Sequence, residues 1–275
     1  MIRFAATVMI FGVVPAAAGD GYVPPFPTVV RPGLEINTRN RAKARVHKCE
    51  DEGLADLRGL SSPFEEFWAY IPGACWWIEL GILEEIRGHI RRDRYGRCRP
   101  PITISGIRKE DVNALIEDHE SLILYHPHPP NASIVEYAIA KSGKMGFPNT
   151  CIEQARTETL ESALPGIPDL MSMIGFSRTF HGRWRQGRFS EKIVSAYGVT
   201  EYRLSGRGKD GLEDQGWAST IRRQVAAYVK ARTGLGERDY KALPSQKENA
   251  RKINELIEFL NPKNGLFVIT FAPFE

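Results

Sequence analysis

The pattern of apolar and polar positions predicts strands and helices in alternation, most clearly after residue 100. Ile102 and Ile104 alternate with polar neighbours, which is typical of a strand with one buried face. Ser105 can then cap a helix, because apolar side chains after it recur at intervals of three and four residues, at Val112, Leu115 and Ile116, with His119 on the same face. A strand at 122–125 and a helix from Ser133 follow.

The rest of the chain adds elements of both kinds. The pattern predicts a helix at 151–164, a β-hairpin of 193–197 and 200–204 around Gly198-Val199, helices at 216–232 and 246–260, and a closing strand at 266–271. Periodicity leaves two alternatives for the apolar run 75–86, a buried strand or a helix, and gives no assignment to 168–189. The basic run 87–99 suggests an exposed loop or hairpin tip. We therefore predict an α+β (mixed α/β) fold in which helices flank a small mixed sheet.

The first residues have the pattern of a secretory signal peptide. Arg3 precedes an apolar run from Phe4 to Val14, and three alanines at 16–18 supply a cleavage site. We expect a signal peptide at 1–19, an extended Pro-rich and basic arm at 20–61, and one globular domain at 62–275. No later apolar run is long enough for a membrane span, so we expect a secreted or periplasmic protein.

Charge and cysteine content narrow the function classes. The 275 residues carry a net charge of +4, with basic and acidic residues interspersed, so no nucleic-acid partner is expected. The four cysteines are widely spaced at 49, 75, 98 and 151. In an oxidising compartment an even number of cysteines favours disulfides, here two bonds, and the sequence leaves their three possible pairings open.

The stretch Ser121 to Gly146 brings together residues that can carry chemistry. His126 and His128 follow a short apolar strand, and a Pro-Pro-Asn turn leads into a helix. Side chains at i and i+2 of a strand point to the same face, so both imidazoles can reach one ion. Neutral imidazole suits zinc, and three protein ligands leave one position open for water. The alternative is that both histidines are structural turn residues.

Ser133 and Glu136 also allow two interpretations. Ser-x-x-Glu before an apolar-periodic run is a capping box, in which the hydroxyl and the carboxylate satisfy amides of the first helical turn. In the other interpretation Glu136 is a third zinc ligand beside His126 and His128, and Ser133 stabilises a bound water or an oxyanion.

The sequence HPHP followed by Ser-x-x-acid resembles the signature of the JAB/MPN (JAMM) zinc metalloproteases. The resemblance covers residues 75–145 at most. It implies that His126, His128 and Glu136 hold zinc, that Ser133 stabilises the oxyanion, and that Glu79 on an upstream strand is the catalytic base. Glu136 stands where the family has aspartate, and the connection from Pro129 to Ser133 is shorter than the family's.

The sequence thus supports two functions of different classes. The first is an exported zinc-dependent hydrolase that acts on a peptide or isopeptide bond of a peptide or protein substrate. The second is a non-catalytic exported protein, either a component of a secretion or conjugation apparatus or a secreted effector that works through protein contacts.

Overall fold

The computed structural model describes residues 45–60, 64–80, 82–87, 90–93, 96–107, 112, 115, 121–142, 148–179, 189–206 and 217–274. The expected signal peptide and most of the expected arm lie outside these residues. Residues 45–58, which we expected in the arm, form a strand and a helix that belong to the main sheet region. No helix in this part of the chain is long and apolar enough to cross a membrane.

A mixed seven-stranded sheet forms the centre of the molecule, so the predicted α+β fold is confirmed. Its strands, in spatial order, are β1 (Arg45–His47), β3 (Trp76–Glu79), β2 (Trp68–Ile71), β8 (Leu122–Pro127), β9 (Phe189–Val194), β10 (Gly198–Leu204) and β11 (Phe267–Pro273). Only β8 and β9 pair in parallel, and the other neighbours are antiparallel. This sheet is larger than the small one we predicted.

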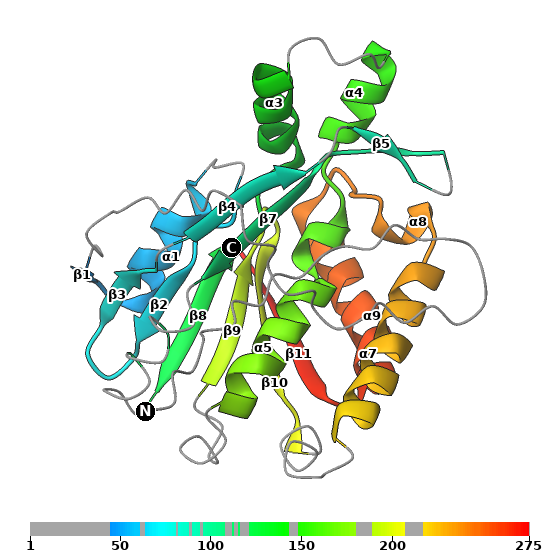
Figure 1. The fold of residues 1–275 in the computed structure, drawn as a ribbon. Coiled ribbons are helices and arrows are strands. Elements are labelled where there is room, and N and C mark those ends of the chain that lie inside the picture. Colours follow the sequence, from blue (N-terminus) through cyan, green and yellow to red (C-terminus); the bar gives the residue numbers. More distant parts are fainter. Residues whose placement is uncertain are drawn as a thin grey trace, which may run out of the picture.

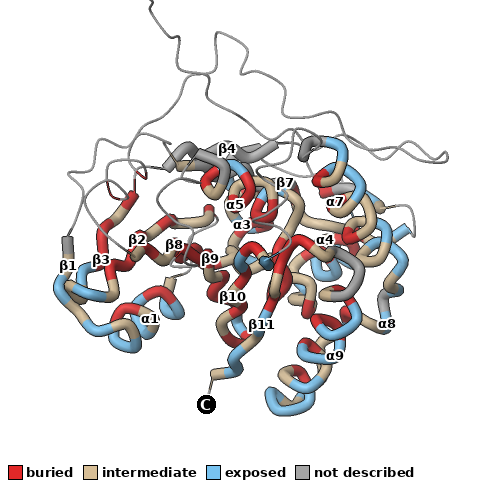
Figure 2. Tube along the Cα trace, turned by 90° about the horizontal axis from the view of Figure 1, so that it is seen from below, coloured by how far each residue is buried: buried red, intermediate tan, exposed pale blue. Residues whose placement is uncertain are grey.

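Helices cover both faces of the sheet. They are α1 (Glu50–Arg58), α3 (Asn131–Ser142), α4 (Asn149–Arg156), α5 (Ile167–Thr179), α7 (Trp217–Gly234), α8 (Glu237–Tyr240) and α9 (Gln246–Asn264), with a short 3-10 helix, η1, at Leu160–Ala163. Helix α1 lies on one face of the strands and α5 on the other, as the end-on view shows (Figures 1 and 2). Helices α7 and α9 pack beside each other near β11 (Figure 1).

The alternation of β8 divides the core between the two faces. Leu122 and Leu124 point into the larger core, which α5, α7 and α9 complete. Tyr125 points the other way, into a smaller cluster with Leu57 of α1 and Trp77. His126 follows Tyr125, so its side chain lies on the face of the larger core.

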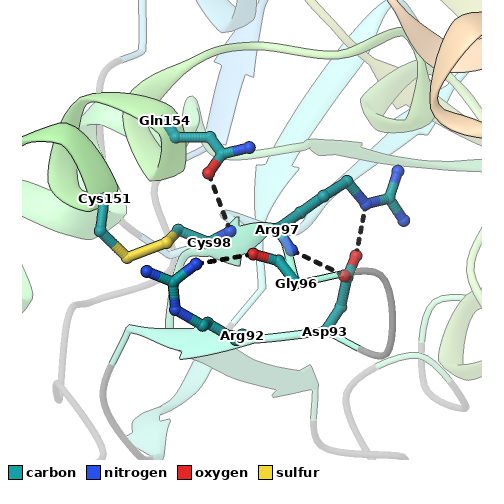
Figure 3. The surroundings of a disulfide bond; sticks show 7 residues. All are labelled: Arg92, Asp93, Gly96, Arg97, Cys98, Cys151 and Gln154. Atoms are coloured by element: carbon teal, nitrogen blue, oxygen red, sulfur yellow. Dashed lines mark hydrogen bonds and ion pairs between the residues drawn. A yellow bond between two sulfur atoms is a disulfide. The ribbon is translucent and has the colours of Figure 1, made fainter.

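Two small antiparallel pairs extend from this body. They are β4 (Ile82–Arg87) with β7 (Ile102–Ile107), and β5 (Arg91–Arg92) with β6 (Cys98–Arg99). A disulfide between Cys98 and Cys151 joins β6 to α4, and the Gln154 side chain accepts a hydrogen bond from the Cys98 amide at 3.2 Å (Figure 3). The described part of the basic run 87–99 therefore forms a hairpin tip, which was one of the two expected alternatives.

Several elements differ from the expected ones. The apolar run 75–86 is two strands, β3 and β4, and the unassigned stretch contains α5. Ser105 lies inside β7 and caps no helix, because that strand continues to Ile107. The expected helix at 151–164 is α4 followed by η1. The hairpin is present, but its turn lies at 195–197 and Gly198 already belongs to β10.

Candidate metal centre

Strand β8 positions both histidines of the HPHP stretch. His126 is the fifth residue of the strand, and the His128 amide continues the pairing with β9 by donating to the Val194 carbonyl at 3.0 Å. The two imidazole rings consequently lie on the same side of the chain, with their centroids 5.2 Å apart. The i, i+2 spacing therefore places both rings on one side of the chain, as predicted from the sequence.

Two carboxylates from distant parts of the chain meet these imidazoles. Glu65 Oε2 lies 3.6 Å from His126 Nδ1, and Glu65 Oε1 lies 3.9 Å from His128 Nε2. Asp169 Oδ2 lies 3.5 Å from His128 Nε2. One ligand atom from each of the four residues lies within 4.8 Å of all the others. Ligands about 2.1 Å from a tetrahedral ion are about 3.4 Å apart, so the spacing approaches that of a zinc site.

Asp169 is held in place by the start of α5. It is the third residue of that helix, and its Oδ2 accepts a hydrogen bond from the Gly166 amide at 2.6 Å. This is the arrangement of a capping box, in which a carboxylate in the first turn reaches back to the amide before the helix. The helix dipole also favours a carboxylate at this end. The same hydrogen bond therefore caps the start of α5 and positions the Asp169 carboxylate.

The segment from η1 to Gly166 forms a wall of the site, and its carbonyl oxygens are bonded from several sides. His128 Nδ1 bonds the Ser162 carbonyl oxygen at 2.7 Å, and the Thr200 hydroxyl donates to the Ala163 carbonyl. The Pro165 carbonyl accepts from the Tyr228 hydroxyl at 2.8 Å and from Arg232. His128 after β8, Thr200 of β10 and helix α7 thus hold the backbone that leads to Asp169.

Glu65 approaches the imidazoles from the segment that leads into β2. In the same segment the Phe67 ring stacks on the His126 ring, with centroids 5.0 Å apart and planes 19° from parallel. The Glu65 side chain is 22% exposed, whereas that of His126 is 1% exposed. The group therefore has an inner, apolar side at His126 and a side open to solvent at Glu65.

The polar atoms of the imidazoles are arranged as metal ligands require. His126 Nδ1 is buried and makes no hydrogen bond, while facing Glu65. His128 Nδ1 donates to the Ser162 carbonyl, so Nδ1 carries a proton, and Nε2, which faces both carboxylates, is the nitrogen on which a metal ion would replace a proton. A hydrogen bond from the second ring nitrogen to a carbonyl is the usual support of a metal-binding histidine.

Burial and mutual charge shift the pKa values of the group in opposite directions. Burial raises the pKa of Glu65 to about 7, against the opposing effect of His128. Burial lowers the pKa of His126 to about 4, so its ring is neutral at pH 7. Burial alone would lower the pKa of His128, but the nearby Asp169 and Glu65 raise it, and the same interaction with His128 holds the pKa of Asp169 below its usual range. Perturbed groups that gather in one place are typical of functional sites.

The three other residues singled out in the sequence lie elsewhere. Glu136 is exposed on α3 and forms an ion pair with Arg156. Glu79 ends β3, where its Cα partner is Trp68 of β2. Neither belongs to the group of four described residues that can share one ion.

Ser133 is the third residue of α3, because the helix already begins at Asn131. The Asn131 amide donates to the Glu158 carboxylate, and the Asn131 side chain donates to the Thr157 carbonyl at 2.9 Å. The helix end is thus held by residues from the segment before η1. Ser133 is too far inside the helix to be its N-cap, so the Ser133–Glu136 capping box is not formed.

Glu65 and Asp169 were not predicted as site residues from the sequence. Asp169 had a local signal, since Pro165-Gly166-Ile167-Pro168-Asp169 places proline in a first helical turn and an acid at its third position. Glu65 stands in a short aromatic stretch, SPFEEFWAY, where no periodicity distinguishes it from Glu66.

Comparison with known proteins adds no relative, because no family model, no curated protein and no solved structure matches the chain. The chemistry of the site is therefore judged from its own atoms. Two imidazole nitrogens and two carboxylates form a donor set that suits zinc and other first-row divalent ions.

Proposed function

We propose that this protein is an exported zinc-dependent hydrolase that cleaves a peptide or isopeptide bond. The observation that carries the proposal is the convergence of four ligand atoms, from Glu65, His126, His128 and Asp169, within 4.8 Å of one another. Three of these residues suffice to hold zinc, and the fourth is then available for proton transfer.

The order of these residues along the chain agrees in part with the JAMM signature, with Asp169 in place of the Glu136 expected from the sequence. A glutamate comes first, His126-x-His128-Pro129 follows, and Gly166-x-x-Asp169 takes the place of the family's Ser-x-x-Asp. Two departures stand out. Residues 130–165 replace a short connection, and glycine replaces the serine. The oxyanion donor must then come from another group of the chain.

We assign His126, His128 and Asp169 as the metal ligands and Glu65 as the general base. A bound zinc ion lowers the pKa of water toward neutrality and polarises a carbonyl group. Glu65 is the most exposed member of the group, and its carboxylate is placed to accept a proton from water and return it to a leaving amine. Asp169, with its low pKa, stays ionised and suits a ligand role.

The disulfide supports the exported part of the proposal. The bond between Cys98 and Cys151 is typical of proteins that mature in an oxidising compartment, such as the periplasm or the extracellular space.

The test is a metal analysis of the purified protein combined with an assay on fluorogenic peptides and a lysine isopeptide substrate. We expect about one zinc per chain, lost in the His126→Ala and His128→Ala variants and retained in His47→Ala, a control because His47 is exposed on β1. Glu65→Gln should keep the zinc and lose hydrolysis.

Two outcomes would overturn the assignment. A wild-type protein that folds and binds no divalent ion removes the hydrolase proposal and leaves the non-catalytic exported protein as the alternative. Zinc lost on Glu65→Gln, together with no hydrolysis by the wild type, indicates a closed site of four protein ligands, which is the pattern of structural zinc.

A further inference from the structure

The inner side of the metal group is a row of three buried side chains from three neighbouring strands. His126 Nε2 on β8 lies 3.1 Å from the Tyr202 hydroxyl on β10, and this hydroxyl donates to Glu191 Oε2 on β9 at 2.6 Å. All three residues are at most 2% exposed. Tyr202 and Glu191 are also direct partners in the antiparallel β9–β10 pair, so their contact is fixed by the strand register.

The direction of these hydrogen bonds determines the protonation of the His126 ring. The Tyr202 hydroxyl has one proton and donates it to Glu191 Oε2, an arrangement that requires this carboxyl oxygen to carry no proton, and toward His126 the hydroxyl then accepts. His126 must then carry its proton on Nε2, which leaves the Nδ1 lone pair directed at Glu65. His128 has the opposite arrangement, because its Nδ1 donates to the Ser162 carbonyl and its Nε2 faces the carboxylates of the site.

We propose that Tyr202 and Glu191 are positioning residues that fix His126 as an Nδ1 ligand of a divalent metal ion. The inference rests on the metal site of the proposed function. A neutral imidazole without such a partner can place its proton on either nitrogen, and a proton on Nδ1 would occupy the position that the ion needs. This assigns a role to Glu191, which is buried and is not one of the four candidate ligands.

The role of Tyr202 predicts a loss of zinc affinity when its hydroxyl alone is removed. Tyr202→Phe keeps the ring and its packing and removes the acceptor of the His126 proton. Outer partners of metal-binding histidines typically account for 10–100-fold in metal affinity, and we expect a loss of about this size in competition with a chromophoric chelator. Tyr240→Phe is the matched control, because its hydroxyl donates to the Arg232 carbonyl at 2.8 Å and contacts none of the four ligands. Its affinity should equal that of the wild type.

The tautomer itself can be read without metal and without activity. Long-range proton–nitrogen correlation spectra of ¹⁵N-histidine-labelled apoprotein distinguish a ring protonated on Nε2 from one protonated on Nδ1. We expect the Nε2–H form for His126 in the wild type, assigned by comparison with His126→Ala. Glu191→Met removes the acceptor, frees the Tyr202 proton for His126, and should convert the ring to the Nδ1–H form.

Each result decides the matter. The inference is overturned by an Nδ1–H tautomer of His126 in the wild-type apoprotein, or by a Tyr202→Phe variant that binds zinc as tightly as the wild type. The wild-type spectrum alone decides if Tyr202→Phe does not fold. If the protein binds zinc and shows the Nε2–H tautomer but hydrolyses none of the substrates, the inference about Tyr202 and Glu191 stands and the hydrolase proposal fails. If the protein binds no divalent ion, both the inference and the hydrolase proposal fail.

Discussion

The Gly166 amide donates a hydrogen bond of 2.6 Å to Asp169 Oδ2, so the cap of α5 and a metal-ligand candidate are the same carboxylate. An oxygen that caps a helix has a fixed direction, and this fixes the side of the imidazole pair from which Asp169 approaches. The interaction allows the charge of Asp169 to be tested separately from its shape.

Asp169→Asn should retain the cap and lose the metal. The asparagine carbonyl can still accept from Gly166, so we expect the apoprotein to keep the cap and to lose only the stabilisation that the charge of Asp169 gives beside His128. Removing an anionic ligand should weaken zinc binding by more than the roughly 100-fold that outer partners account for, as measured by chelator competition. Glu136→Gln is the control, since Glu136 pairs with Arg156 at the surface and should leave zinc affinity unchanged. Zinc loss in Glu136→Gln instead would restore the ligand set expected from the sequence.

Zinc affinity should depend on pH around neutrality. The pKa of Glu65 is raised to about 7 and that of His128 is also raised, so below these values protons occupy atoms that face the ion. Metal binding must release the proton of the ligand His128, so affinity should fall by about tenfold per pH unit below the pKa of that ring and level off above it. Competition titrations between pH 5.5 and 8.5 measure this slope. An affinity independent of pH over that range would contradict the assignment.

Gly53 of α1 should tolerate no side chain. It is buried, and a Cβ built on it would overlap the Trp77 indole ring. Gly53→Ala should therefore lower the free energy of unfolding by about 1–3 kcal/mol although alanine is the better helix former. Gly175→Ala in α5 is the matched control, because a Cβ there meets no atom within 4 Å, and it should stabilise by about 0.5–1 kcal/mol. Equal effects in urea unfolding would show that α1 does not pack on Trp77.

The remaining cysteines should form a second disulfide in an oxidising compartment. Cys49 and Cys75 are not bonded to each other in the structure, but they lie close together. The Lys48 amide donates to the Cys75 carbonyl at 3.0 Å. The Cys75 thiol is also the main cause of the raised pKa of the Cys49 thiol. Exchange with an external disulfide such as oxidised glutathione would take up the two protons and two electrons. The bond should add about 3 kcal/mol of stability.

Peptide mass spectrometry without reduction measures the pairing. We expect a linked Cys49–Cys75 peptide pair and no free thiol in the denatured protein, and one free thiol in Cys49→Ser with the Cys98–Cys151 bond intact. Two free thiols in a protein whose Cys98–Cys151 bond is formed would exclude the second disulfide.

Local pattern was sufficient for some elements and for half of the candidate site. The histidine pair could be predicted because two positions on one strand share a face whatever the rest of the fold does. Helices α7 and α9 and strand β11 lie within a few residues of the predicted spans for the same reason, since their apolar positions repeat regularly.

The carboxylates could not be predicted because packing between distant elements brings them to the imidazoles. Asp169 stands 41 positions after His128 and reaches it only when α5 lies on the sheet. Glu136 is nearer in sequence, but α3 directs it to solvent and to Arg156. Sequence proximity therefore favoured the wrong neighbour for the imidazoles within the described structure.

The wall of the site also has a consequence for biogenesis. The Pro165 carbonyl accepts hydrogen bonds from Tyr228 and Arg232, which lie in the last quarter of the chain. A nascent polypeptide that ends before α7 has both imidazoles but lacks the support for the third candidate ligand. A chain that lacks α7 should therefore bind a metal ion at this site more weakly than the full chain.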